Sequence, residues 1–236
     1  MLHNPYLYRV VRNEGTMKQA ILIIVFGAAV LSSRMTAQTL QPQDDIQSWN
    51  EIQLTVPLTE HFEFYTAATA RLDGNVTRMN DGRYAIGFGW KPTKSLTIMP
   101  FYWYIKMRNA TGQFRIENRL SVRATYRFPV KQFGLIHRST YEYRSRRPLT
   151  AWRYRFGMLA EKELPKKFMS STKAFIGDEV FYDSLLNRIS RNRFTVGINK
   201  GLSKQLSADI YYLRQNDRFS RPGNLHVIGV TWRVKM

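Results

Sequence analysis

Charged residues recur at every second position in several stretches of this chain, a spacing that gathers their side chains on one face of an extended strand. The segment FRIENRLSVRATYRF, residues 114–128, has apolar residues at nearly all even positions and charged or hydroxyl-bearing residues at the odd positions. Because successive side chains of a β-strand point to opposite faces, the segment predicts one strand between two unlike media. Eleven charged residues are assigned to the polar faces of such strands: Arg115, Glu117, Arg119, Arg123, Arg138, Glu142, Arg144, Arg153, Arg155, Glu179 and Arg193.

These rows of guanidinium and carboxylate groups can serve two purposes inside a closed barrel. A barrel of about 8 to 12 strands has little free lumen, so the arginines can pack against carboxylates as an electrostatic plug. Rings of arginine also favour anionic and phosphate-bearing solutes, so the same rows can line a pocket or a narrow anion-preferring channel. We expect a structural or solute-related role, and the sequence leaves plug and passage open as alternatives.

His137 and Ser139 form a separate candidate pair in the triplet HRS. Both lie on the apolar face of their strand, where a histidine can act as the base for a neighbouring serine nucleophile. On a lipid-facing wall this chemistry would make a lipid-acting hydrolase, whereas the simpler alternative is hydrogen bonding to lipid headgroups. We predict no enzymatic activity and no catalytic residue, because the longer motifs of outer-membrane phospholipases and deacylases are missing.

No metal or cofactor site is expected. The sequence contains no cysteine, which excludes thiolate ligands and thiol catalysis. The other histidines, His3, His61 and His226, lack the spacing of metal ligands, and no glycine-rich phosphate loop occurs.

The two-residue alternation also predicts the strands that hold these side chains. It occurs eleven times after the polar segment TLQPQDDIQ, and no segment shows a useful helical period. In the fourth stretch, TIMPFYWYIKM, the apolar row consists of Met99, Phe101, Trp103, Ile105 and Met107. Tight turns are expected near residues 57–60, 92–95, 129–132, 165–167 and 201–204, and longer polar loops near 73–82, 108–112, 146–150, 183–190 and 216–223.

The length and charge of the polar rows favour a transmembrane barrel. Strands that cross a membrane need about 9 to 11 residues, and closure of the sheet pairs every backbone amide in lipid. We predict an all-β fold over residues 38–236, a single antiparallel up-and-down transmembrane β-barrel of 10–12 strands with its apolar rows outside. Bacterial single-chain barrels have even strand numbers, so ten or twelve are expected rather than eleven. The alternative is a soluble lipocalin-like sandwich with the apolar rows packed together.

The N-terminal part of the sequence carries an export signal. The apolar run Ala20–Leu31 is too short to cross a bilayer as a helix but has the length of a secretory core. We predict that residues 1–16 are an over-extended start and residues 17–37 a cleavable signal peptide. The expected location is the outer membrane of a Gram-negative cell.

The excess of basic over acidic residues indicates which partners the protein can bind. The chain has 36 Lys and Arg against 17 Asp and Glu, a formal net charge of +19, which is typical of proteins that meet nucleic acid or anionic membranes. An exported barrel is not expected to bind nucleic acid, so we expect outer-membrane lipids, lipopolysaccharide and the barrel-assembly machinery as partners of a monomer. A basic collar, which either pairs with lipopolysaccharide phosphates or is solvated, consists of Arg78, Arg83, Arg108, Arg146, Arg147, Arg188, Arg191, Arg218 and Arg221.

Several short motifs resemble one known family. They are QSWNEIQL near the start of the barrel region, Arg71, IENRL at residues 116–120, YEYR at 141–144, WRYRFG at 152–157, DEVFYD at 178–183 and NRFTVGI at 192–198. With these motifs the chain is similar to the bacterial domain of unknown function 2490 family, over nearly all of the region after the leader. The resemblance implies an exported outer-membrane barrel and no particular activity.

Overall fold

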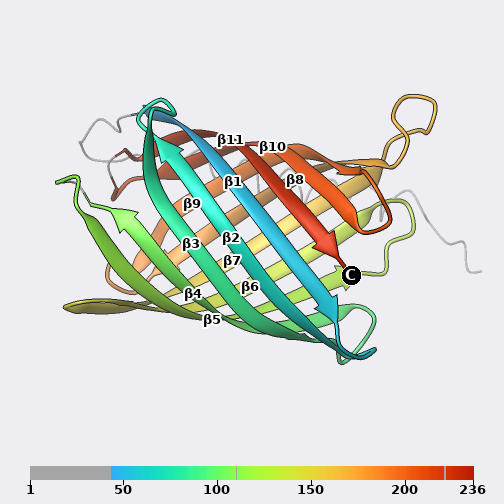
Figure 1. Cartoon of the computed structure of the whole chain (residues 1–236), viewed down its shortest axis with the longest axis horizontal. Coiled ribbons are helices and arrows are strands. Elements are labelled where there is room, and N and C mark those ends of the chain that lie inside the picture. Colours follow the sequence, from blue (N-terminus) through green and yellow to red (C-terminus); the bar gives the residue numbers. More distant parts are fainter. Residues whose placement is uncertain (1–43, 110, 221) are drawn as a thin grey trace, which may run out of the picture. The chain divides into compact units, whose positions relative to one another are not determined.

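The computed structural model describes residues 44–109, 111–220 and 222–236 (Figure 1). This part of the chain is all β, and its strands are β1 (Asp44–Pro57), β2 (Phe62–Asp73), β3 (Arg78–Trp90), β4 (Leu96–Arg108), β5 (Phe114–Phe128), β6 (Gly134–Arg146), β7 (Leu149–Glu163), β8 (Thr172–Asp183), β9 (Arg188–Gly201), β10 (Leu206–Asp217) and β11 (Asn224–Lys235). The predicted over-extended start (1–16), the signal peptide (17–37) and residues 38–43 lie outside the described residues.

None of the described residues belongs to a helix that is long and apolar enough to cross a membrane.

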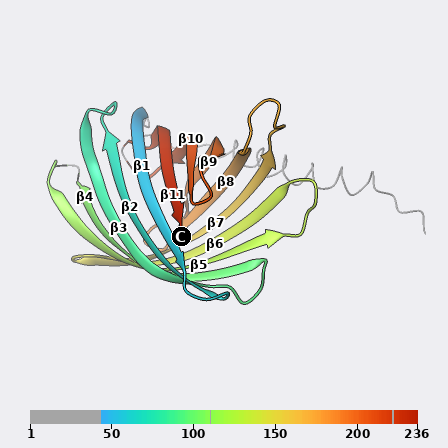
Figure 2. The same cartoon turned by 45° about the vertical axis from the view of Figure 1, so that its right-hand side comes forward.

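The eleven strands of the described region close into a barrel in chain order. Each strand pairs antiparallel with the next, whereas β1 and β11 pair in parallel from Asp44 opposite Asn224 to Thr55 opposite Lys235. Figures 1 and 2 show these two strands side by side, in blue and red. The predicted closed all-β barrel and the eleven alternating stretches are confirmed. The expected even number is wrong, because a meander with an odd number of strands starts and ends at opposite rims and can close only through a parallel pair.

The alternation separates the two faces of the barrel as predicted. In β5, Glu117 is 0% and Arg119 is 7% exposed on the inside, whereas Ile116 and Leu120 are 51% and 61% exposed on the outside. Apolar side chains of β1, β2 and β3 are likewise exposed on the outer face, among them Ile52, Phe62, Tyr84, Ile86 and Phe88. The sandwich alternative, with apolar rows packed against one another, is therefore wrong.

Strand β4 departs from this pattern. Its predicted apolar row faces the inside, where Phe101 is 4% and Ile105 is 0% exposed, and Trp103 and Met99 pack against a buried cluster in the interior. The pairing with β5 requires this orientation, because Trp103 lies opposite the inward Arg119 and residues directly opposite each other share a face. The predicted outward orientation of this row was wrong because both faces of β4 are largely apolar, so the alternation does not show which face is inside.

A glycine on the neighbouring strand β3 makes space for the inward residues of β4. These residues are Met99, Phe101, Trp103, Ile105 and Met107. Phe101 lies opposite Gly87, and a Cβ atom at that position would be 2.4 Å from the Cβ of Phe101. Glycine is therefore what allows an aromatic ring to enter the barrel at this point.

The expected difference between tight turns and long loops is also wrong. Residues 74–77 and 184–187 connect strands with four residues each, and residues 147–148 with two, whereas the eight-residue connection 164–171 lies at the rim where tight turns were expected. Polar residues assigned to loops continue the strands instead. Arg78, for example, begins β3 and pairs with Asp73 at the end of β2 at 2.6 Å.

The parallel seam can be tested by cross-linking, since the chain contains no native cysteine. Asn50 and Val230 are direct partners across the β1–β11 seam and share the outer face. Neighbouring strands lie about 4.8 Å apart, within the range that a disulfide bridges. We expect Asn50→Cys/Val230→Cys to cross-link on oxidation of the folded protein, measured by peptide mass spectrometry. Asn50→Cys/Val122→Cys, with the second cysteine on β5, should not, and equal yields in both variants would contradict the closed seam.

Candidate functional site

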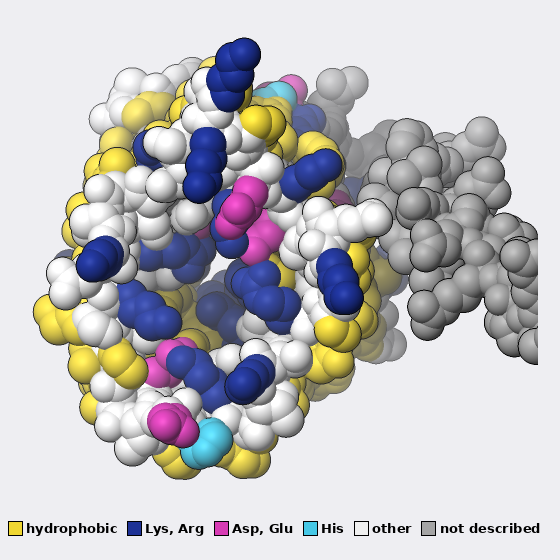
Figure 3. Space-filling view, turned by 90° about the vertical axis from the view of Figure 1, so that its right-hand side faces the viewer, with side chains coloured by type: hydrophobic (Ala, Val, Ile, Leu, Met, Phe, Trp, Pro, Cys, Tyr) yellow, Lys and Arg dark blue, Asp and Glu magenta, His cyan; other side chains and the backbone are white. Residues whose placement is uncertain are grey.

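The barrel interior contains a cavity of about 910 Å³ that is lined by residues from every strand of the described region. Fourteen Arg or Lys residues and seven Asp or Glu residues are among those that line it. The lining extends from Arg127 and Glu161 near one rim to Arg146 and Ser220 near the other. Figure 3 shows Lys and Arg side chains around a central hollow, with apolar side chains at the circumference. The interior is therefore polar, hollow and positively charged.

A network of ion pairs occupies one wall of this interior, and Glu117 is its first centre. The carboxylate of Glu117 is fully buried and accepts hydrogen bonds from Arg119 at 2.6 Å and from Arg144 at 3.0 Å. A third guanidinium, that of Arg146, lies 3.1 Å from its other oxygen. A buried carboxylate is tolerated only with such partners, because the loss of hydration costs several kcal/mol per ion.

Glu142 is the second centre and links this cluster to the next strands. It is also fully buried, and Arg119 and Arg155 lie 3.2 Å and 2.9 Å from one of its oxygens. Arg155 in turn binds both oxygens of Glu179 at 2.8 Å. Arg153 and Arg144 complete the network at Asp183, at 2.8 Å and 3.2 Å.

The network thus brings together seven of the eleven residues predicted from the sequence: Glu117, Arg119, Glu142, Arg144, Arg153, Arg155 and Glu179. Asp183, which pairs with two arginines, was not among the predicted residues. It lies four positions after Glu179 on β8, so the two-residue period would have placed it on the same inward face.

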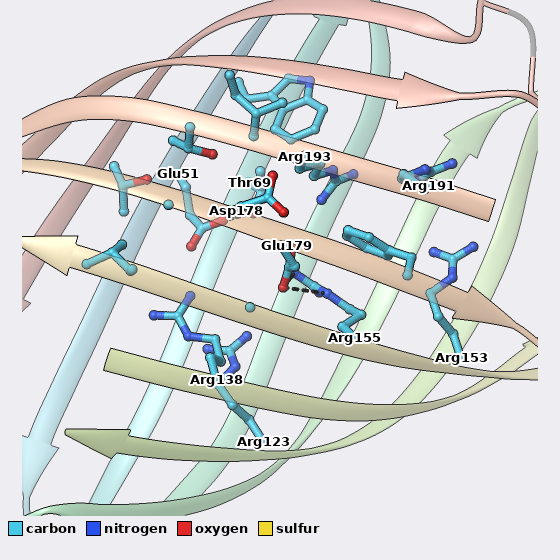
Figure 4. A pocket seen from close by; sticks show the side chains of 18 of the residues that line it. Glu51, Thr69, Arg123, Arg138, Arg153, Arg155, Asp178, Glu179, Arg191 and Arg193 are labelled. Carbon is cyan, nitrogen blue, oxygen red and sulfur yellow. Dashed lines mark hydrogen bonds and ion pairs between the residues drawn. The ribbon is translucent and has the colours of Figure 1, made fainter. Parts of the chain in front are cut away.

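The other four predicted residues are held differently. Arg115 is exposed at the start of β5 and forms no ion pair with the described residues, although Glu117 lies only two positions further along the strand. Arg193 donates to Gln215 at 2.9 Å, and its guanidinium lies over the rings of Trp49 and Phe181. Arg123 and Arg138 form no ion pair with any described residue, and their buried Nε atoms have no hydrogen-bond partner. Figure 4 shows these two side chains near the Arg155–Glu179 pair.

The wall formed by β1, β2 and β4 has a different character, with aromatic rings between isolated polar groups. The guanidinium of Arg71 stacks 3.6 Å from the ring centre of Trp49. Glu51 accepts a hydrogen bond from Thr69 at 3.0 Å and another from Gln53, and it forms no ion pair with the described residues. These residues were not predicted from the sequence, because a single carboxylate on an alternating strand gives no signal of its own.

The outer face carries the His137–Ser139 pair, and the structure brings the two side chains together. The Nε2 atom of His137 lies 2.8 Å from the hydroxyl of Ser139, which also bonds to the hydroxyl of Tyr154 at 2.7 Å. The His137 ring packs on Phe156. No described residue bonds to Nδ1 of His137, so the ring is oriented by its contact with Ser139 and by packing on Phe156.

The predicted basic collar is smaller than expected. Arg83 and Arg191 line the cavity and pair with Asp81 and Asp217, at 2.6 Å and 2.5 Å, and Arg146 pairs with Glu117 as described above. They turn inward because the strands extend into segments that were expected to be loops. Arg221 lies outside the described residues.

The interior carboxylates are poorly suited to a metal ion. Glu117, Glu142 and Asp183 are each held by two or more guanidiniums, whose positive charge repels a cation. Across the described part of the chain, no three His, Asp or Glu side chains gather as a metal site would require. The arrangement suits anions instead.

A family model with the description "Protein of unknown function (DUF2490)" matches residues 46–225, about three quarters of the chain. This match confirms the resemblance inferred from the motifs. No curated protein matches the chain at a significant level.

Removing one carboxylate tests whether the network stabilises the barrel. Glu142→Gln keeps the side-chain size but leaves Arg119 and Arg155 short of a buried counter-charge, so we expect a loss of about 3–5 kcal/mol in the free energy of unfolding. Glu161→Gln is the matched control, because its partners Arg127 and Lys173 are both largely exposed and such pairs contribute about 1 kcal/mol or less each. Denaturant unfolding in detergent, followed by tryptophan fluorescence, measures both. Equal losses would show that the network does not stabilise the barrel more than a rim pair does.

Proposed function

The chain belongs to the DUF2490 family, whose description states no function, and we propose that it is an outer-membrane β-barrel whose positively charged interior admits small anions. This is a solute-related and non-enzymatic role. The observation that carries it is the cavity whose lining reaches from rim to rim with twice as many basic as acidic residues.

The outer wall supports placement in a membrane. Tyr84, Leu120 and Ile228 are each more than 60% exposed in the middle of long strands, and many other large apolar side chains accompany them. Soluble monomers rarely expose apolar surface on this scale. The strands have 12 to 15 residues, enough to cross a bilayer when tilted, and the closed ladder leaves no unpaired edge in lipid.

The interior supports a preference for anions. Fixed positive charge in a narrow space with walls of low dielectric constant concentrates anions and repels cations. The ion pairs of β5 to β8 neutralise much of this charge but lie against one wall, and the cavity remains beside them. The plug and the passage therefore coexist in one interior.

Conductance in planar lipid bilayers tests this function. We expect the purified protein to conduct, with a reversal potential in a salt gradient that has the sign of chloride preference. Arg123→Glu should lower that preference because the side chain lines the cavity, whereas Arg147→Glu at the exposed β6–β7 turn should leave it unchanged. Absence of conductance from folded protein, or a preference for cations, would contradict the proposal.

A second candidate function is hydrolysis of a lipid ester, favoured by the 2.8 Å contact between His137 and Ser139 on the outer face. In this reaction Nε2 of His137 accepts the hydroxyl proton while the Ser139 oxygen attacks the ester carbonyl carbon, the alcohol leaves, and water then releases the fatty acid. The Tyr154 hydroxyl lies close enough to donate to the developing oxyanion.

The hydrolase candidate is tested by fatty-acid release from phospholipid vesicles that contain the protein. Under this candidate, wild-type protein releases fatty acid and Ser139→Ala does not. Ser145→Ala, at another outward position of β6, should behave like wild type. If wild-type protein releases no fatty acid, the candidate is rejected.

A further inference from the structure

We infer that Arg123 and Arg138 form a binding site for a phosphate group inside the barrel. This oxyanion site, Arg123 and Arg138, deepens the proposed function and rests on it, because the ligand must enter the charged interior. It differs from a general positive field in that two particular guanidiniums are left without a protein partner.

The sheet register brings the two side chains together. Arg123 lies opposite Thr140 and Arg138 lies opposite Thr125 in the β5–β6 ladder, so the two arginines are diagonal neighbours on the inner face. Diagonal neighbours in an antiparallel pair have Cβ atoms about 7 to 8 Å apart. Two long side chains that start at this distance can both reach one small ligand.

Their lack of partners separates them from the other interior arginines. Arg193 has an amide partner and two rings, and the others each form an ion pair with a carboxylate: Arg71, Arg83, Arg119, Arg144, Arg146, Arg153, Arg155, Arg191 and Arg233. The pair of Arg71 with Asp81 is long, at 3.9 Å, and its buried Nε has no hydrogen-bond partner, but its guanidinium stacks on Trp49. Arg123 has only the ring of Phe101, 4.8 Å from its guanidinium carbon, and Arg138 forms no hydrogen bond or ion pair with any described residue. Two adjacent, partly buried and unpaired cations are unfavourable in the empty protein, and an anion between them removes the cost.

Two carboxylates neighbour these arginines in the sheet register, and neither forms an ion pair with Arg123 or Arg138. Glu142 is diagonal to Arg123 and is bound by Arg119 and Arg155 through one oxygen, while its other oxygen is buried without a hydrogen-bond partner. Glu179, which follows Gly157 in the ladder row of Arg138, has both oxygens bound by Arg155 at 2.8 Å. Gly157 has no side chain to fill the intervening space, and it lines the cavity. A Cβ atom at Gly157 would lie 3.4 Å from Cγ of Glu179, so the Glu179 side chain lies over this glycine in the row of Arg138, but its ion pair is formed with Arg155.

The chemistry of the two arginines specifies the ligand. A guanidinium presents a planar fork of N–H donors that matches two oxygens of a tetrahedral oxyanion, and phosphate, like sulfate, can satisfy two forks with more than one negative charge. Chloride offers one charge and no fixed geometry. The site should therefore take inorganic phosphate or the phosphoryl end of a small phosphate monoester in preference to chloride.

Binding can be measured at equilibrium without transport. Purified protein in detergent is titrated with inorganic phosphate, with glycerol phosphate and with sodium chloride at matched ionic strength, and the thermal unfolding midpoint is followed. We expect the midpoint to rise and saturate with phosphate but not with chloride. Saturation with glycerol phosphate as well would assign the phosphoryl group as the ligand, and saturation with inorganic phosphate alone would assign the free ion.

Variants identify the residues. Arg123→Gln and Arg138→Gln should each weaken phosphate affinity about tenfold or more, the loss of charge-assisted hydrogen bonds. Arg191→Gln is the matched control, because this arginine also lines the cavity but is held by Asp217, so its affinity should equal that of wild type. In phosphate-free buffer, Arg138→Gln should unfold at a higher temperature than wild type, since an unpaired charge has been removed; this also shows that the variant is folded.

The outcomes of these experiments distinguish the oxyanion site from the proposed passage for anions through the barrel. Saturable phosphate binding in a protein that does not conduct would support the site and reject the passage. Anion-selective conductance with phosphate affinity unchanged by both Gln variants would overturn the site and leave the passage standing. A midpoint that responds equally to chloride and phosphate would also overturn the site.

Discussion

Closure of the backbone ladder is the constraint on which the rest of this structure depends. Eleven strands running up and down leave the first and last strand parallel, and the twelve-residue register between β1 and β11 supplies the hydrogen bonds that an open seam would lack. Parallel pairs are slightly weaker per residue than antiparallel ones, so the length of the seam matters. Once the sheet is closed, every strand has one enclosed face and one outer face, and the two-residue period decides which side chain goes where.

Enclosure explains the network of ion pairs. Side chains such as Glu117 and Glu142 lose nearly all contact with solvent inside the barrel, so each needs more than one guanidinium. Consecutive strands β5 to β8 provide these partners because their charged rows lie side by side. The opposite wall is built from rings, with Trp49 and Phe101 beside cations, so the interior combines a dense polar wall with an aromatic one.

The sequence predicted the features that depend on period and failed on those that depend on register. The alternation of β5 identified its two faces, and the same period gave the closed all-β barrel. Strand β4 misled because both its faces are apolar, and only its pairing with β5 shows that Phe101 points inward. The expectation of an even strand number failed for the same reason, since nothing local to β1 or β11 indicates a parallel partner at the far end of the chain. The prediction of long polar loops failed because polar residues such as Arg78 also extend strands when a neighbour such as Asp73 pairs with them.

Side-chain pairing decides which arginines are available to a solute. Arg119 and Arg123 lie four residues apart on one face of β5 and are indistinguishable by composition or period. Both are diagonal to Glu142 across the ladder, but Arg119 forms an ion pair with it, whereas Arg123, directly opposite Thr140, forms none. Glu179 cannot compensate, because Arg155 holds both its oxygens. The strong pairs therefore create the unpaired ones: because Arg119 and Arg155 bind the neighbouring carboxylates, Arg123 and Arg138 line the cavity without an ion pair.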